Sequence, residues 1–240
     1  MMITRDLTLT ERAYQYIRGK LVSGELAPGT RLVNRAIAKE IGTSAIPVRE
    51  AISRLISEGL VEYVPSAGAY VRTRSPQELS DMFDLREAIE PVAAAKAAEH
   101  ISEHEVEELQ SIVDDWREMV RGLRNRPEGR LSPAQVDRWR ENEQRFHHVI
   151  IDAARNGLMS KFARELHVVG QVFDGLARET EVIAPAPAEQ MCRSYEAMLA
   201  AIRARDAEKL RGLVHDHIRR SRDAAFERLR RPDGRRGRKK

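Results

Sequence analysis

Ionisable and polar residues recur at helical spacing in the second half of the chain, where they interrupt stripes of apolar residues. Glu143 and His147 are four residues apart, so both side chains project from one face of a helix and could coordinate one metal ion. His217, in a later helical segment, could be a third ligand. Arg86 and Tyr195 share faces with apolar residues in the same way. Because ionisable groups facing a helical core are costly unless paired or hydrated, the pattern predicts one shared polar cavity.

Three interpretations of this cavity stay open. The first is a divalent metal held by Glu143, His147 and His217, with an open position for the carboxylate of an effector. The second is metal-free binding of a small organic acid through Arg86, Tyr195 and His217. The third is a buried polar network in which the groups satisfy each other without a ligand.

The other histidines are expected at the surface. His148 and His215 lie about 100–200° round their helices from the inward positions, so they are predicted to face solvent. His100, His104 and His167 have no matching partners and are also predicted to be surface residues.

The composition excludes several classes of protein. Of the 240 residues 42% are hydrophobic and 32% charged, which excludes a wholly disordered chain. A single cysteine, Cys192, excludes an internal disulfide framework and a cysteine-based zinc cluster. No apolar run approaches the roughly 20 residues that span a bilayer, and no signal-peptide pattern is present. A soluble, cytoplasmic protein with no membrane partner is expected.

Positive charge is concentrated at the two ends of the chain. Residues 1–73 carry ten Lys/Arg against seven Asp/Glu, and residues 228–240 carry eight against one, while the segment between them is net negative. A basic N-terminal segment on an acidic body indicates that a polyanionic partner meets the N-terminal end. Residues 231–240 are predicted to be a basic, disordered tail.

Helix-start signals and one hairpin pattern organise the chain. A cap residue is followed three positions on by Glu or Gln four times, at Thr8, Ser75, Ser102 and Ser132. Further helices are predicted at about 158–181, 188–204 and 206–230, and one stretch alone, 60–71, has the pattern of strands around a turn. The predicted fold is mainly α. It has a winged helix-turn-helix domain over 1–73 (three helices and a β-hairpin) and an all-helical bundle of about six helices over 74–230.

The third predicted helix has the features of a DNA reader. Ser44 can cap it, Pro47 is tolerated in the first turn, and an apolar stripe that begins at Val48 defines one buried side. Arg49 lies off that stripe, so the N-terminal turn could enter a major groove while the other side is packed. The alternative is that Arg49 is a solvated residue paired with a neighbouring glutamate.

Residues 8–73 resemble the DNA-binding domain of GntR-type bacterial regulators. The resemblance is carried by a run of motifs: Gly24-Glu25-Leu26-Ala27-Pro28-Gly29-Thr30-Arg31-Leu32, Ile37-Ala38, Ile41-Gly42-Thr43-Ser44, Pro47-Val48-Arg49-Glu50-Ala51 and Glu58-Gly59-Leu60. It implies that Arg35, Ser44 and Arg49 contact phosphates or base edges, and that Gly68 of the wing enters the minor groove. Ala45 and Ile46 stand where the family usually has Arg and Thr. An operator of different sequence, or weaker specific binding, is therefore expected, and Ile46 could contact a thymine methyl.

The second half resembles the FCD ligand-binding domain of FadR-subfamily GntR regulators. Metal-binding members use Asp-x-x-x-His and two later histidines, and here the matching positions are Glu143, His147, Tyr195 and His217. The resemblance implies a divalent ion such as zinc, nickel or manganese, for which the neutral phenol of Tyr195 is a poor ligand.

Together these features predict a transcription regulator, a repressor, that binds double-stranded operator DNA as a homodimer and responds to a small organic acid. No nucleophile–base pair or phosphate-cradling glycine loop is evident, so enzymatic activity is not expected. The alternatives are a DNA-binding architectural protein without an effector, and a metal-dependent hydrolase in which a Glu/His/His site activates water.

Overall fold

The computed structural model describes residues 7–73, 75–124, 130–175 and 185–230. It divides into two compact units, Met1–Ser75 with Val168–Glu179 and Pro76–His167 with Thr180–Lys240. The described residues are mostly helical with one small sheet, which confirms the predicted fold class. The predicted tail, 231–240, lies outside the described residues.

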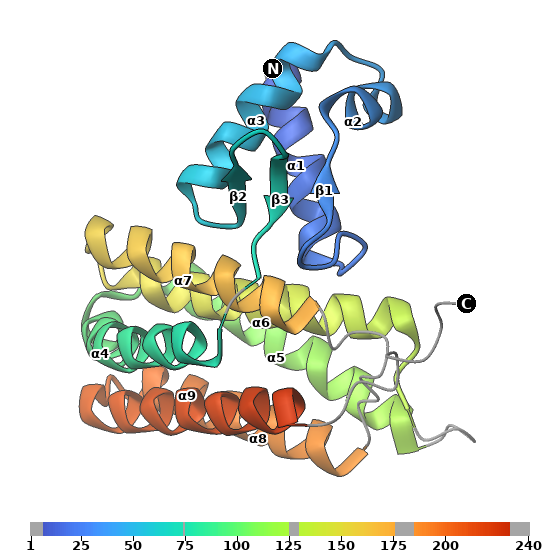
Figure 1. The fold of residues 1–240 in the computed structure, drawn as a ribbon. Helices are drawn as coiled ribbons and strands as arrows, with labels where there is room; N and C mark the ends of the chain where they lie inside the picture. Colours follow the sequence, from blue (N-terminus) through green and yellow to red (C-terminus); the bar gives the residue numbers. More distant parts are fainter. Residues whose placement is uncertain (1–6, 74, 125–129, 176–184, 231–240) are drawn as a thin grey trace, which may run out of the picture. The chain divides into compact units, whose positions relative to one another are not determined.

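The N-terminal part of the first unit has three helices and a sheet of three strands (Figure 1). The elements in chain order are α1 (Leu9–Val22), β1 (Arg31–Leu32), α2 (Asn34–Ile41), α3 (Ala45–Ser57), β2 (Val61–Val64) and β3 (Gly68–Val71). Fully buried residues of the three helices, Ile17, Ala38 and Leu55 among them, pack with the inward residues of the sheet in one core. Gly42 ends α2 in the left-handed conformation (φ 70°), which allows the sharp turn into α3.

The sheet has one strand more than the sequence predicted. β1 pairs antiparallel with β3, with Arg31 opposite Tyr70 and Leu32 opposite Ala69, and the strand order is β1-β3-β2. The prediction of a single hairpin was therefore incomplete. A two-residue strand has no room for an alternating pattern, and its pairing is fixed by the tertiary structure.

The second unit contains six described helices (Figure 1). They are α4 (Pro76–His100), α5 (Glu103–Arg124), α6 (Pro133–Ala153), the first part of α7 (Gly157–Gly175), α8 (Pro185–Arg203) and α9 (Ala207–Arg230). α4, α5 and α6 begin directly after the predicted caps Ser75, Ser102 and Ser132. At the last of these, the Ser132 hydroxyl accepts from the Gln135 amide while the Gln135 side chain accepts from the Ser132 amide. α8 begins three residues before the predicted start at 188. α4 packs along α9 and α6, while α5 packs on α8 and α6.

Aromatic side chains form the centre of this bundle. The Trp116 ring of α5 stacks on the Tyr195 ring of α8 at a centroid distance of 4.2 Å, and the Phe146 ring of α6 meets Tyr195 edge-on at 4.9 Å. Trp139 packs against Trp116 at 5.7 Å. Such contacts add to the burial of large apolar surface and fix the orientation of each ring. Tyr195 is therefore held rigidly, with its hydroxyl in the polar cluster described below.

Candidate nucleic-acid interface and buried ligand site

One side of α3 is buried and its N-terminal turn is exposed. Val48, Ala51 and Leu55 are fully buried. In the N-terminal turn, Ile46 is 59% exposed, and Ser44 holds the N-cap position without a side-chain capping bond. The helix is anchored by its apolar stripe, which leaves this turn available to a partner.

The exposed arginines of this surface are not neutralised by neighbouring acids. Within the described residues, Arg35 of α2 and Arg49 of α3 form no ion pair or hydrogen bond. Arg54, one turn further along α3, is instead held by Glu58 at 3.1 Å and by Glu11 at 2.9 Å. Among the described residues Arg49 therefore does not pair with a neighbouring glutamate, which was the alternative interpretation. The cationic side chains of Arg35 and Arg49 are both exposed.

The tip of the wing carries small residues and a cation that comes from another strand. Gly68 begins β3 at φ 111°, a conformation that favours glycine. The Arg31 guanidinium of β1 lies beside it, 3.6–3.7 Å from where a Cβ would stand. Arg31 was not among the residues predicted to contact DNA, because its place beside the wing follows from the β1–β3 pairing.

Inside the second unit, the polar residues predicted from spacing come together. Tyr195 Oη of α8 donates to Glu143 Oε1 of α6 at 3.0 Å and lies 3.5 Å from His147 Nε2. The His217 ring of α9 lies 5.0 Å from that of His147 and 5.4 Å from that of Tyr195, centroid to centroid. His147, Tyr195 and His217 are buried, and Glu143 is half-buried.

A second group of charges adjoins this cluster. Glu90 of α4 accepts from Arg86 Nε at 2.7 Å and lies 2.9 Å from His167 Nε2 of α7. The His167 ring also meets the His147 ring edge-on at 5.3 Å, which joins the two groups. Glu90 is 2% exposed. The buried ionisable groups of α4, α6, α7, α8 and α9 thus form one continuous network.

Two predictions about histidines were wrong. His167 was predicted at the surface but is buried against Glu90. His148 was predicted to face solvent, yet it is half-buried and stacks on His167 at 6.0 Å. The partner of His167 lies 77 residues earlier in the chain, so local spacing carried no sign of it. His100 and His104 are exposed, as predicted. His215, also predicted to face solvent, is half-buried, with 42% of its side chain exposed.

Burial and neighbouring charges set the protonation of these groups. Burial lowers the pKa of His217 to about 3, with the Arg86 charge adding to the effect. Burial likewise lowers the pKa of His147 well below its usual value, so both imidazoles are neutral at pH 7. Burial and then the Glu143 charge raise the pKa of Tyr195. Burial alone would raise the pKa of Glu90, but Arg86 and His167 hold it low, so it stays ionised.

The donors that face each other fit a metal ion. The ligand atoms of Glu143, His147 and His217 all lie within 4.8 Å of one another. Two neutral imidazoles and a carboxylate are suitable ligands for a transition metal, at bond lengths of about 2.0–2.2 Å. The buried Tyr195 hydroxyl, hydrogen-bonded to Glu143, stands beside this set.

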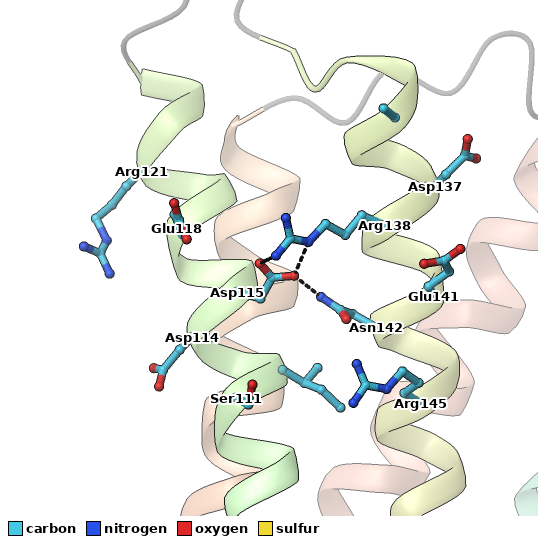
Figure 2. A pocket seen from close by; sticks show the side chains of 12 residues that line it. Ser111, Asp114, Asp115, Glu118, Arg121, Asp137, Arg138, Glu141, Asn142 and Arg145 are labelled. Carbon is cyan, nitrogen blue, oxygen red and sulfur yellow. Dashed lines mark hydrogen bonds and ion pairs between the residues drawn. The ribbon is translucent and has the colours of Figure 1, made fainter. Parts of the chain in front are cut away.

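A separate surface groove of about 920 Å³ lies between α5 and α6 (Figure 2). Two of its side chains are held by Asp115, which accepts from Arg138 Nε at 2.8 Å and from Asn142 Nδ2 at 2.5 Å. None of the predicted site residues lines this groove. The groove and the predicted ligand cluster are therefore separate features of the second unit.

Comparison with known proteins agrees with both halves of this description. Residues 9–71 match the gntR family of bacterial regulatory proteins, and residues 81–220 match the FCD domain. The chain belongs to the GntR family, in the FadR-like group with an FCD domain. It is a DNA-binding transcription regulator.

Relatives of this GntR regulator are similar to it along most of its length. The HTH-type transcriptional regulator McbR of Escherichia coli K12 is 24% identical over 207 residues, which covers 86% of this chain and 88% of that protein. A probable D-xylose utilization operon transcriptional repressor of Paenarthrobacter nicotinovorans is 25% identical over 211 residues, 88% of this chain and 86% of that protein. The solved structure of E. coli McbR/YncC has the same fold, with a TM-score of 0.78 at 22% identity over 93% of this chain and 100% of that chain. None of the described helices is long and apolar enough to cross a membrane.

The buried charge network makes a prediction for stability. Glu90→Gln should lower the free energy of unfolding of the second unit by about 3–5 kcal/mol, because it removes the buried carboxylate that Arg86 and His167 share. Both tryptophans, Trp116 and Trp139, lie in that unit, so their fluorescence in a urea titration reports it selectively. Glu99→Gln, at an exposed position of α4, is the control and should change stability by less than about 0.5 kcal/mol. Equal effects of the two variants would contradict the assignment.

Proposed function

We propose that this GntR regulator is a homodimeric repressor. Its affinity for operator DNA is controlled by a small carboxylate bound in the buried cluster of the second unit. The observation that carries the proposal is the convergence of Arg86, Glu143, His147, Tyr195 and His217 inside a bundle that shares its chain with a DNA-binding domain. A bundle with a purely structural role would be stabilised more simply by apolar residues, since each buried ionisable group costs free energy.

DNA recognition is assigned to the N-terminal turn of α3 and to the wing. Arg35 and Arg49 supply outward cations, while the exposed Ser44 hydroxyl and Ile46 side chain occupy the turn that would face base edges. The Ile46 side chain can contact a thymine methyl, whereas Ala45 has no side-chain donor for guanine. The operator should therefore differ from those of relatives that have arginine at position 45. Arg31, beside Gly68, adds a cation at the wing.

The DNA assignment predicts the behaviour of single arginine variants. If the lost contact is to a base, Arg49→Ala and Arg35→Ala should each weaken DNA binding by about 1–3 kcal/mol. If it is to a phosphate, each should reduce the slope of log affinity against log salt concentration by about one. Fluorescence anisotropy, with a duplex selected from a random pool by the unaltered protein, measures both quantities. Arg12→Ala, which removes the same charge from an exposed position of α1, is the control. Unchanged affinity in both test variants would refute the assignment.

Effector binding is assigned to the side of the cluster that carries positive charge. Glu90 holds the Arg86 guanidinium through Nε and Nη2, so the orientation of its plane is fixed. Tyr195 supplies a neutral hydroxyl, and the neutral His217 ring lies next to it. A guanidinium with hydroxyl and imidazole neighbours matches the charge and hydrogen-bonding needs of a carboxylate. An acid can change DNA binding only if it binds the two states of the protein with different affinity.

A titration of carboxylic acids into the protein–DNA complex tests this role. We expect at least one mono-, di- or tricarboxylate to weaken DNA binding by roughly 5–150-fold, the usual range of coupling between two sites. Tyr195→Phe and Arg86→Lys should abolish the response without changing DNA affinity in the absence of the acid. Arg138→Lys, in the α5/α6 groove, should respond normally. If no acid releases DNA, the protein is an effector-independent DNA-binding protein.

The exposed face of α4 suits the pairing of two copies. Its exposed residues follow helical spacing and include two apolar side chains, Leu85 at 52% and Val92 at 37% exposure. Around a two-fold axis between Ala88 and Ile89, two antiparallel α4 helices would set each Leu85 against Val92 of the second copy. Asp81 and Lys96 are equally far from that axis, so Asp81 of each copy would form an ion pair with Lys96 of the other. This self-complementarity is what a two-fold interface requires.

Charge reversal tests this register. Lys96→Asp should weaken the dimer by about two- to thirtyfold, since each exposed ion pair contributes about 0.2–1 kcal/mol and the interface contains two. Asp81→Lys combined with Lys96→Asp should restore it, because the pairs re-form with reversed signs. Sedimentation equilibrium measures the dissociation constants, with Leu229→Asp on α9 as a control at an exposed apolar site. Failure of the double variant to recover would exclude this pairing.

A further inference from the structure

The groove between α5 and α6 carries acidic side chains that are not neutralised. Its lining has three arginines and five acids, namely Asp114, Asp115, Glu118, Asp137 and Glu141. Two of the arginines are already paired with acids of α5. Within the described residues, Glu118, Asp137 and Glu141 form no ion pair or hydrogen bond. Figure 2 shows Glu118 on the α5 side and Glu141 on the α6 side of the Asp115–Arg138 pair. The groove therefore keeps unpaired negative charge on both of its walls.

A buried amide in the same groove lacks a hydrogen-bond donor. Asn142 is 5% exposed and donates through Nδ2 to Asp115 at 2.5 Å. No described residue donates to its Oδ1. A buried carbonyl oxygen without a donor costs free energy, and an arginine side chain has five N–H groups that could supply one. The groove thus offers an acceptor as well as carboxylates to a cationic partner.

The most basic segment of the chain follows directly after α9. Residues 231–240 contain six lysines and arginines and one aspartate, and proline is their single apolar residue. Such a segment has no apolar surface to bury, so it can recognise a partner only by charge and hydrogen bonds. Its charge is opposite to that of the groove, and its arginines carry the donors that the groove lacks.

The position of α9 brings this segment within reach of the groove. Arg222 of α9 pairs with Asp84 near the start of α4, while Arg205 donates to the Ala98 carbonyl near its end, so α9 ends beside the start of α4. α5 ends and α6 begins at this same end of the bundle (Figure 1). α8 packs on α9 and α5, so the groove lies two helix spacings from α9, about 16–20 Å. Ten extended residues span up to about 33 Å, which is enough.

We propose that residues 231–240 dock in the α5/α6 groove of the same chain. Their lysines and arginines pair with Glu118, Asp137 and Glu141. One arginine donates to Asn142 Oδ1. Each exposed ion pair shifts an equilibrium by a factor of only about 1.4–5. Because the segment is tethered to α9, its effective concentration at the groove is on the order of millimolar, so a few weak pairs suffice to hold it.

Carbodiimide cross-linking of the full-length protein without DNA tests this docking, since it joins a lysine to a carboxylate in contact with it. We expect Lys239 or Lys240 to be linked to Glu118, Asp137 or Glu141 in chains that keep the monomer mass under denaturing conditions. Mass spectrometry of proteolytic fragments identifies the links. Their yield should fall about tenfold in roughly 1 M salt, where the screening length is about 3 Å.

Two controls show whether the links are specific. Glu103 and Glu208, whose side chains are 88% and 79% exposed at the other end of the bundle, should form no link to the segment. Arg235→Gln combined with Arg236→Gln removes two pairs and should lower the yield of groove links by about two- to 25-fold. Arg203→Gln combined with Arg219→Gln, at exposed positions of α8 and α9, should leave the yield unchanged.

Three results would overturn the proposal. The first is the absence of groove links, or links to Glu103 and Glu208 in equal yield. The second is groove links found only in chains of dimer mass, which would place the segment on a second copy. The third concerns DNA: if groove links are absent and the Arg235/Arg236 variant lowers the slope of log DNA affinity against log salt concentration by about two, the segment binds phosphates instead.

Discussion

The cost of burying charge governs the second unit of this regulator. A buried ion without a partner costs several kcal/mol, so Glu90 and Arg86 can be enclosed only together, and His167 completes their hydrogen bonding from another helix. The same burial keeps His147 and His217 neutral. The bundle therefore separates two kinds of group. An ion pair lies beside α4 and α7, and uncharged side chains with lone pairs lie between α6, α8 and α9.

That separation determines what the site can bind. The uncharged imidazoles with the Glu143 carboxylate suit a cation, whereas the Arg86 guanidinium suits an anion. Packing against Trp116 and Phe146 fixes the orientation of the Tyr195 ring, and with it the direction of its hydroxyl.

The DNA-binding domain uses the opposite arrangement. Arg35 and Arg49 have no acidic partners among the described residues, while Arg54, further from the N-terminal turn of α3, is neutralised by Glu11 and Glu58. Charge is therefore retained where a phosphate backbone would lie and cancelled elsewhere on the helix. Membership of the GntR family with an FCD domain accounts for the presence of both arrangements in one chain.

The amino-acid sequence determined the starts of the capped helices α1, α4, α5 and α6, the apolar face of α3 and the inward positions of Glu143, His147, Tyr195 and His217. Caps and helical periodicity are local properties, so they can be recognised without the fold. Two features depended on the tertiary structure: the pairing of β1 with β3, which brings Arg31 to the wing, and the burial of His167 against Glu90. Both join residues far apart in the chain. A histidine or a two-residue strand carries no local sign of such a partner, so only the folded chain decides whether it is buried or exposed.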